Sequence, residues 1–214
     1  MTRGFCLFLL ISLSVSGVVA KEPERWDGTI AFGNLKLPFS MQLRIDGPQA
    51  AASFTNLGEA GGISGKGSIA GDTLKITFEA RNAVLEGKLD GGSLKGVYST
   101  PFGKYTVDAG RFCTCGFQGE AGPDISGAWT LEGTKGKLSV ERKGEDTLGI
   151  LTLDSSTTPT LAGRFDGAVF TLAYFNGDPA GAAWLEIEPD KDARVLTLVY
   201  QKPGLDPVRL KATR

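Results

Sequence analysis

The chain divides at Arg111-Phe-Cys-Thr-Cys-Gly-Phe-Gln-Gly-Glu-Ala-Gly-Pro-Asp-Ile-Ser-Gly-Ala-Trp129. This stretch is rich in Gly and contains a Pro, which is typical of a connection rather than of a strand or helix. The segments on its two sides resemble each other, because each opens on a strand-like run that carries a tryptophan, Trp26 before it and Trp129 at its end. We therefore interpret residues 113–123 as a linker between residues 21–112 and 124–214.

Short alternating runs dominate the segment before the linker. From Leu37 to Ile45, apolar residues alternate strictly with Pro, Ser, Gln and Arg. A period of two predicts a strand with one buried face and one solvated face. Asp90-Gly91-Gly92 is a strong hairpin signal, and Gly65 and Gly67 inside a strand predict tight curvature or close approach of another backbone. We expect eight strands between Trp26 and Phe112, separated by turns every ~8–12 residues.

The same pattern returns after the linker. The hairpin at Leu161–Leu172 parallels the one at Gly67–Ile76, and eight strands are again expected. Because the links are hairpin-like, we predict an all-β protein of two tandem antiparallel up-and-down meander barrels, lipocalin- or avidin-like, in which closure removes the sheet edges. Duplication explains the recurrence. The alternative is one continuous sheet whose halves look alike because all amphipathic hairpins do.

Composition limits the function. The 214 residues carry a net charge of −1 and include no histidine. The charge gives no basic surface for nucleic acid, and a His-dependent triad or His-ligated zinc site is excluded. No catalytic constellation stands out, so we expect a non-enzymatic protein without cofactor or metal.

The N-terminus has the features of a secretory signal. A basic start at Arg3 precedes an apolar run from Phe5 to Val15, and polar residues begin at Lys21. We expect cleavage after Ala20, so that residues 1–20 are a signal peptide and the protein is secreted or periplasmic. The alternative is an uncleaved anchor, but the run is shorter than the ~20 residues that a membrane helix needs. No membrane span is expected after cleavage.

Cys113 and Cys115 stand in the linker. Two cysteines in a secreted chain usually pair, but residues two apart in a strand approach the largest separation that a disulfide tolerates. The pair is therefore either structural or incidental, redox-active, or a ligand of a soft metal or of another chain. Two thiolates alone make a poor zinc site.

Bulky apolar residues on the strands are candidates to line a ligand-binding interior. They are Trp26, Phe39, Trp129, Phe170 and Trp184. An eight-stranded barrel is either just filled by its side chains or holds one small ligand, so these residues are either packed core or a binding surface. The acidic residues from Glu186 to Asp192 alternate with Leu185 and Ile187, which favours a solvated outer face over a catalytic acid pair.

Several motifs resemble the N-terminal β-rich region of bacterial secreted TlpA-type thiol-disulfide oxidoreductases. They cover most of the chain after residue 20 and are Trp26–Ile30, Leu37–Leu43, Leu85–Tyr98, Arg111-Phe112, Asp124–Trp129, Leu161–Phe175 and Leu210–Arg214. In that family a thioredoxin-like domain with a Trp-Cys-x-x-Cys site follows, and these 214 residues contain no such motif. The resemblance implies a stand-alone or truncated accessory region.

The expected function is therefore a non-catalytic extracytoplasmic binding module, accessory to a thioredoxin-like oxidoreductase or another periplasmic protein. The alternatives are a small-ligand-binding barrel and a dithiol redox protein that uses Cys113 and Cys115.

Overall fold

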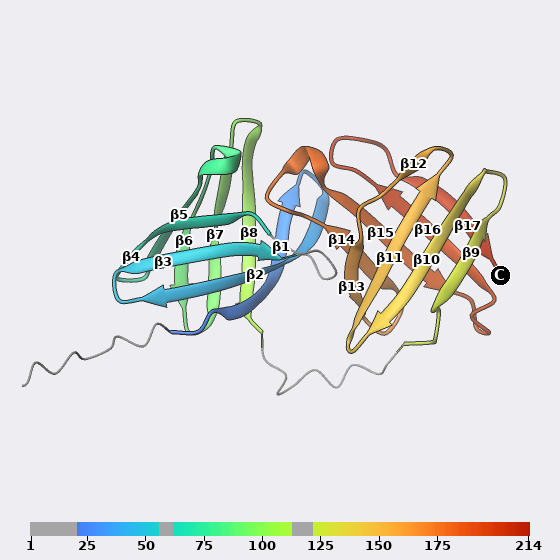
Figure 1. Ribbon diagram of the computed structural model, residues 1–214, viewed down its shortest axis with the longest axis horizontal. Helices are drawn as coiled ribbons and strands as arrows, with labels where there is room; N and C mark the ends of the chain where they lie inside the picture. The colour runs from blue at the N-terminus through green and yellow to red at the C-terminus, as the bar shows by residue number, and fades with distance from the viewer. Residues whose placement is uncertain (1–20, 56–61, 113–121) are drawn as a thin grey trace, which may run out of the picture.

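Amphipathic strands build this chain into two closed antiparallel barrels that lie side by side (Figure 1). The computed structural model describes residues 21–55, 62–112 and 122–214. The expected signal peptide and the two linker cysteines lie outside these residues. Among the helices of the described residues, none is long and apolar enough to cross a membrane.

The first barrel is a meander in which each strand pairs with the next. Its strands are β1 (Glu24–Phe32), β2 (Leu35–Asp46), β3 (Gln49–Thr55), β4 (Ser64–Ala70), β5 (Thr73–Phe78), β6 (Ala83–Asp90), β7 (Ser93–Thr100) and β8 (Gly103–Arg111), with the 3-10 turn η1 (Glu79–Arg81) between β5 and β6. Pairing of β1 with β8, from Trp26 opposite Arg111 to Ile30 opposite Val107, closes the barrel. Closure leaves no free sheet edge.

The second barrel repeats this order. Its strands are β9 (Gly127–Leu131), β10 (Gly136–Lys143), β11 (Asp146–Leu153), β12 (Ser156–Thr157), β13 (Leu161–Phe165), β14 (Phe170–Tyr174), β15 (Ala183–Pro189), β16 (Val195–Gln201) and β17 (Val208–Thr213), with the 3-10 turn η2 (Pro179–Gly181) before β15. Pairing of β9 with both β10 and β17 completes the ring of eight, and β12 is a two-residue addition at its edge. The predicted pair of eight-stranded meander barrels is confirmed.

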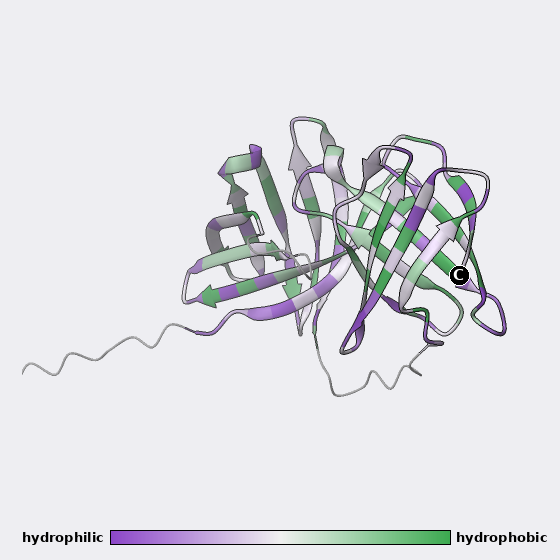
Figure 2. Cartoon of the chain, turned by 45° about the vertical axis from the view of Figure 1, so that its right-hand side comes forward, coloured by the Kyte–Doolittle hydropathy of each residue, from purple (hydrophilic) through white to green (hydrophobic). Residues whose placement is uncertain are grey.

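Alternating side chains produce the two cores, as Figure 2 shows in the green and purple bands along the strands. In β2, for example, Leu37, Phe39, Met41 and Leu43 point inward and are buried. The predicted close approach at Gly67 is also confirmed, because a Cβ there would lie 1.7 Å from the carbonyl oxygen of Lys75.

A matched Trp–Arg pair marks the same end of both barrels. The guanidinium of Arg111 lies 5.8 Å from the ring of Trp26, and that of Arg214 lies 4.3 Å from the ring of Trp129. The spacings are identical, since 111 − 26 = 85 and 214 − 129 = 85. Both tryptophans are buried, so each pair combines apolar burial with a cation–π contact. This recurrence supports an internal repeat.

Candidate functional site

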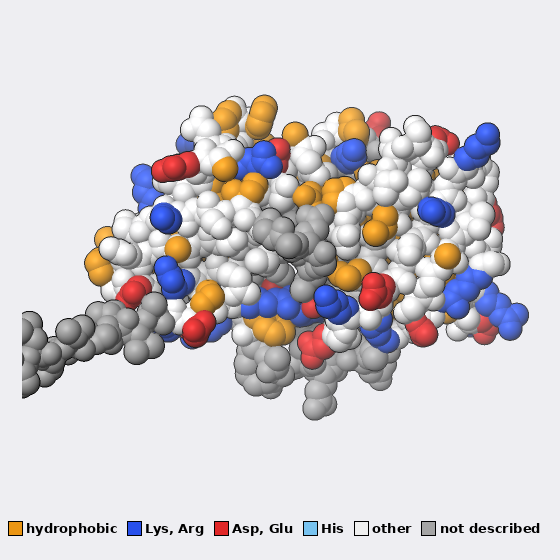
Figure 3. Space-filling view, viewed as in Figure 1, with side chains coloured by type: hydrophobic (Ala, Val, Ile, Leu, Met, Phe, Trp, Pro, Cys, Tyr) orange, Lys and Arg blue, Asp and Glu red, His pale blue; other side chains and the backbone are white. Residues whose placement is uncertain are grey.

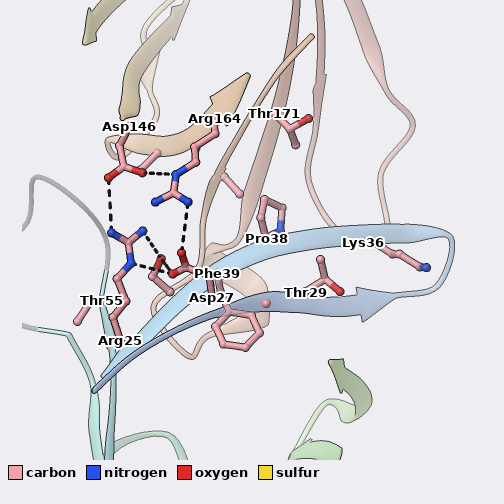
Figure 4. A pocket seen from close by; sticks show the side chains of 15 residues that line it. Arg25, Asp27, Thr29, Lys36, Pro38, Phe39, Thr55, Asp146, Arg164 and Thr171 are labelled. Carbon is pink, nitrogen blue, oxygen red and sulfur yellow. Dashed lines mark hydrogen bonds and ion pairs between the residues drawn. The ribbon is translucent and has the colours of Figure 1, made fainter. Parts of the chain in front are cut away.

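A cleft opens where the two barrels meet. Its volume is about 300 Å³, and side chains from β1 and β2 of the first barrel face side chains from β11, β13 and β14 of the second (Figure 4). Figure 3 shows basic and acidic side chains gathered along this junction. Because both barrels contribute to it, the cleft exists only in the assembled pair.

Four charged side chains form a ring at one end of the cleft. Arg25 Nε lies 2.8 Å from Asp27 Oδ1, and Arg164 Nε lies 2.9 Å from Asp146 Oδ1. Two longer pairs cross between the barrels: Arg25 Nη1 to Asp146 Oδ2 at 3.6 Å, and Arg164 Nη1 to Asp27 Oδ2 at 3.7 Å. Each carboxylate therefore lies between two guanidiniums, and the ring ties β1 to β11 and β13.

The local environment supports these charges. The four side chains are 13–29% exposed, so solvent screens them less than it screens surface pairs. The Ser40 hydroxyl donates to Asp27 Oδ1 over 2.7 Å. Burial would lower the pKa of Arg25, but hydrogen bonding and charge from Asp27 and Asp146 outweigh it and raise that pKa. Arg25 therefore stays protonated at the centre of these ion pairs.

Phe112 lies against both arginines of this ring. The centroid of the Phe112 aromatic ring is 4.5 Å from the Arg25 guanidinium carbon and 4.9 Å from that of Arg164. Cations near an aromatic face are attracted by its quadrupole, and the contact shields the ion pairs from water on that side. The last described residue of the first barrel thus contacts a side chain from each barrel.

The rest of the cleft combines an apolar wall with hydroxyl groups. Pro38, Phe39 and Ala173 supply the wall, and Thr29 and Thr171 line the cleft beside it. Lys36 lies at the end opposite the ring in Figure 4, is exposed, and makes no ion pair within the described part of the chain. With three cations against two carboxylates, this surface suits a ligand or partner group that has an apolar body and an acidic end.

The second barrel also closes one end of the first. Phe175, in the connection after β14, is 1% exposed, and its ring centroid lies 5.0 Å from that of Phe54 and 5.9 Å from those of Phe32 and Tyr98. The Tyr98 hydroxyl donates a 2.7 Å hydrogen bond to the Gly177 carbonyl. Gly177 has φ +86°, and a Cβ there would lie 3.2 Å from the Tyr98 hydroxyl oxygen. Phe175 therefore fills the mouth of the first barrel.

This buried phenol predicts a pH effect on stability. Burial raises the pKa of Tyr98 above its ordinary value of 10.0. The folded protein holds this proton to a higher pH than the unfolded chain, so the stabilisation is complete below about pH 10 and is lost as the pH rises above it. Tyr98→Phe should cost about 1–3 kcal/mol at neutral pH, because the Gly177 carbonyl loses its partner, and should lessen the alkaline decline.

Thermal unfolding measured across this pH range tests that expectation. Tyr105→Phe, on the strand that pairs with β7, is the matched control and should keep the alkaline decline of the wild type. An unchanged decline in Tyr98→Phe would contradict the assignment.

The candidate interior residues occupy two kinds of position. Trp26, Phe39, Trp129 and Phe170 are at most 6% exposed and belong to the packed cores, and Phe39 also lines the cleft. Trp184, the fifth candidate, does not line the interior of its own barrel. It lies on the outer face of β15, because Ala183 and Leu185 beside it take the inward positions, and it packs against the core of the first barrel.

Sequence reasoning missed the ring of Arg25, Asp27, Asp146 and Arg164. All four lie on strand positions that point out of their own barrel, and no periodic signal separates them from ordinary surface charges. Within the described residues, no cluster of three or more acidic or cysteine side chains has the arrangement of a metal site. The turn residue Asp190 accepts hydrogen bonds from the backbone N–H groups of Arg194 and Val195 at 2.7 and 3.0 Å.

Comparisons with known proteins add little. No protein-family model and no curated protein matches the chain. Among solved structures, it is similar to a protein of unknown function from the DUF3598 family of Nostoc punctiforme. The match has 12% identity and a TM-score of 0.26, and it covers 88% of this chain and 93% of that one.

Proposed function

We propose that this protein is a non-catalytic binding module that acts outside the cytoplasm and recognises a partner protein through the cleft between its barrels. The observation that carries the proposal is the cleft itself, where an ion-pair ring, an apolar wall and the exposed Lys36 come together from both barrels. Its partner would be a thioredoxin-like domain of the TlpA type, as the sequence resemblance implies.

Two features support binding over catalysis or transport. Each carboxylate of the ring is held between two guanidiniums, which suits a fixed surface better than proton transfer. The first barrel is packed with buried aromatic and aliphatic side chains and is filled at one mouth by Phe175, so its interior favours a structural role over that of a ligand carrier.

Filling the cleft tests the proposal. We expect Thr29→Trp to weaken binding to a purified thioredoxin-like domain of a TlpA-type oxidoreductase from the same organism by at least about tenfold, measured by isothermal titration calorimetry. Thr106→Trp places the same residue on an exposed position of β8 and should bind like the wild type. Thermal unfolding of both variants would establish that they are folded.

Charge provides a second arm of this experiment. Lys36→Glu should weaken binding if the partner presents an acidic group, whereas Lys104→Glu, on the exposed face of β8, should not. Failure of the wild type to bind the domain, or equal binding by Thr29→Trp and the wild type, would overturn the proposal.

A further inference from the structure

Among the described residues, none fills one mouth of the second barrel. A cavity of about 400 Å³ lies at the end of β11 and β16 and the start of β15 and β17. Its wall includes the buried Leu151, Ala183 and Tyr200, together with Leu205 and Val208, which are 62% and 45% exposed. Large apolar side chains left in water around a concave surface are typical of a binding site.

Strand pairing makes this mouth the counterpart of the one that Phe175 fills. Tyr98 on β7 stands opposite Leu85 on β6, and Tyr200 on β16 stands opposite Leu185 on β15. Both tyrosines are buried on the penultimate strand of their barrel, near its end. The two mouths therefore share a tyrosine at the same place.

The first mouth shows which chemistry this arrangement accepts. It takes an aromatic side chain, Phe175, and the hydroxyl of its tyrosine donates to the backbone carbonyl two residues later, at Gly177. The occupant is thus a short protein segment, which the first barrel binds through the aromatic ring of Phe175 and the backbone carbonyl of Gly177.

The mouth of the second barrel has the same hydrogen-bond donor, the tyrosine hydroxyl, and is lined by smaller side chains. The place of Phe54 in the first barrel is taken by Leu151, and that of Tyr105 by Val208, according to the strand registers. Within the described chain, no group forms a hydrogen bond with the Tyr200 hydroxyl. Burial raises the pKa of Tyr200, which keeps the hydroxyl protonated and able to donate.

We propose that the mouth of the second barrel binds a partner-protein segment that inserts an aromatic side chain between Leu151 and Val208 and offers a backbone carbonyl to the Tyr200 hydroxyl. This site is separate from the cleft between the barrels, and it does not depend on the function proposed for that cleft.

A peptide copied from this chain tests the inference. The probe is the acetylated and amidated peptide Tyr-Phe-Asn-Gly-Asp, the sequence of residues 174–178. We expect it to bind the full chain weakly, and Tyr200→Phe to weaken binding by about tenfold, the value of one hydrogen bond. A peptide with alanine in place of its phenylalanine should lose binding, as measured by NMR chemical-shift titration.

Tyr98→Phe is the matched control, because it makes the same change at the filled mouth and should leave the affinity for the peptide unchanged. Sensitivity to Tyr98→Phe with no effect of Tyr200→Phe would mean that the peptide displaces the Phe175 segment instead, and would overturn the proposal. Absence of binding at millimolar peptide would overturn it as well. Equal binding of N-acetylphenylalaninamide would assign the site to free aromatic compounds rather than to a protein segment.

Discussion

Replacing Phe175 by alanine is expected to lower the free energy of unfolding by about 3–5 kcal/mol, which is the usual cost of removing a buried phenylalanine ring. Phe175 is 1% exposed and contacts Phe32, Phe39, Phe54 and Tyr98 of the other barrel. Truncation would leave a cavity at the mouth of the first barrel, and its rigid aromatic walls could collapse only partly. The loss should therefore fall near the upper end of that range.

Urea unfolding followed by tryptophan fluorescence measures this effect. Phe102→Ala is the control, since Phe102 is 74% exposed and its removal should change stability by less than about 0.5 kcal/mol. Because Phe175 joins the barrels, the variant should also separate one unfolding transition into two. A single transition with wild-type midpoint would contradict the role assigned to Phe175.

Neutralising one member of the ion-pair ring should have the next largest effect. Asp146→Asn leaves Arg25 and Arg164 to share Asp27 alone, two cations against one carboxylate. Removing one partner of a fully buried pair costs about 3–5 kcal/mol, and the 13–29% exposure of this ring reduces the expected loss to about 2–3 kcal/mol. The measurement is urea unfolding at low and high salt.

A double variant separates charge from packing. Asp146→Leu combined with Arg164→Met removes an anion and a cation together, so it should be more stable than Asp146→Asn if unpaired charge causes the loss. Glu86→Gln is the control, because the Lys75–Glu86 pair is 59% exposed on both sides and contributes about 0–1 kcal/mol. If Asp146→Asn cost no more than Glu86→Gln, the ring would be an ordinary surface feature.

The barrels were predictable because their signals are local. Strict alternation from Leu37 to Ile45 specifies a half-buried strand wherever it occurs, and the glycines of Asp90-Gly91-Gly92 adopt positive φ in the turn, as a tight hairpin requires. Repetition of these signals around the linker predicted two barrels rather than one. The signal peptide over residues 1–20 and the roles of Cys113 and Cys115 stay predictions.

The junction between the barrels was not predictable in this way. Trp184 alternates with Leu185 just as a surface residue would, and only the neighbouring barrel explains why a tryptophan occupies an outer position. Arg25 and Asp146 are 146 − 25 = 121 residues apart, and no period or motif joins them. Their pairing depends on how two finished barrels dock.

The sequence by itself determined the strands, the hairpins and the repeated two-barrel pattern, because each of these depends on residues that are neighbours in the chain. Only the tertiary structure decided that Phe175 fills the first barrel, that four charges close a ring beside the cleft, and that none of the described residues fills one mouth of the second barrel. The physical reason is that docking joins the outer surface of one barrel to the end of another. Binary patterning distinguishes buried from solvated positions within one barrel, and it carries no information about which outer positions a second barrel will cover.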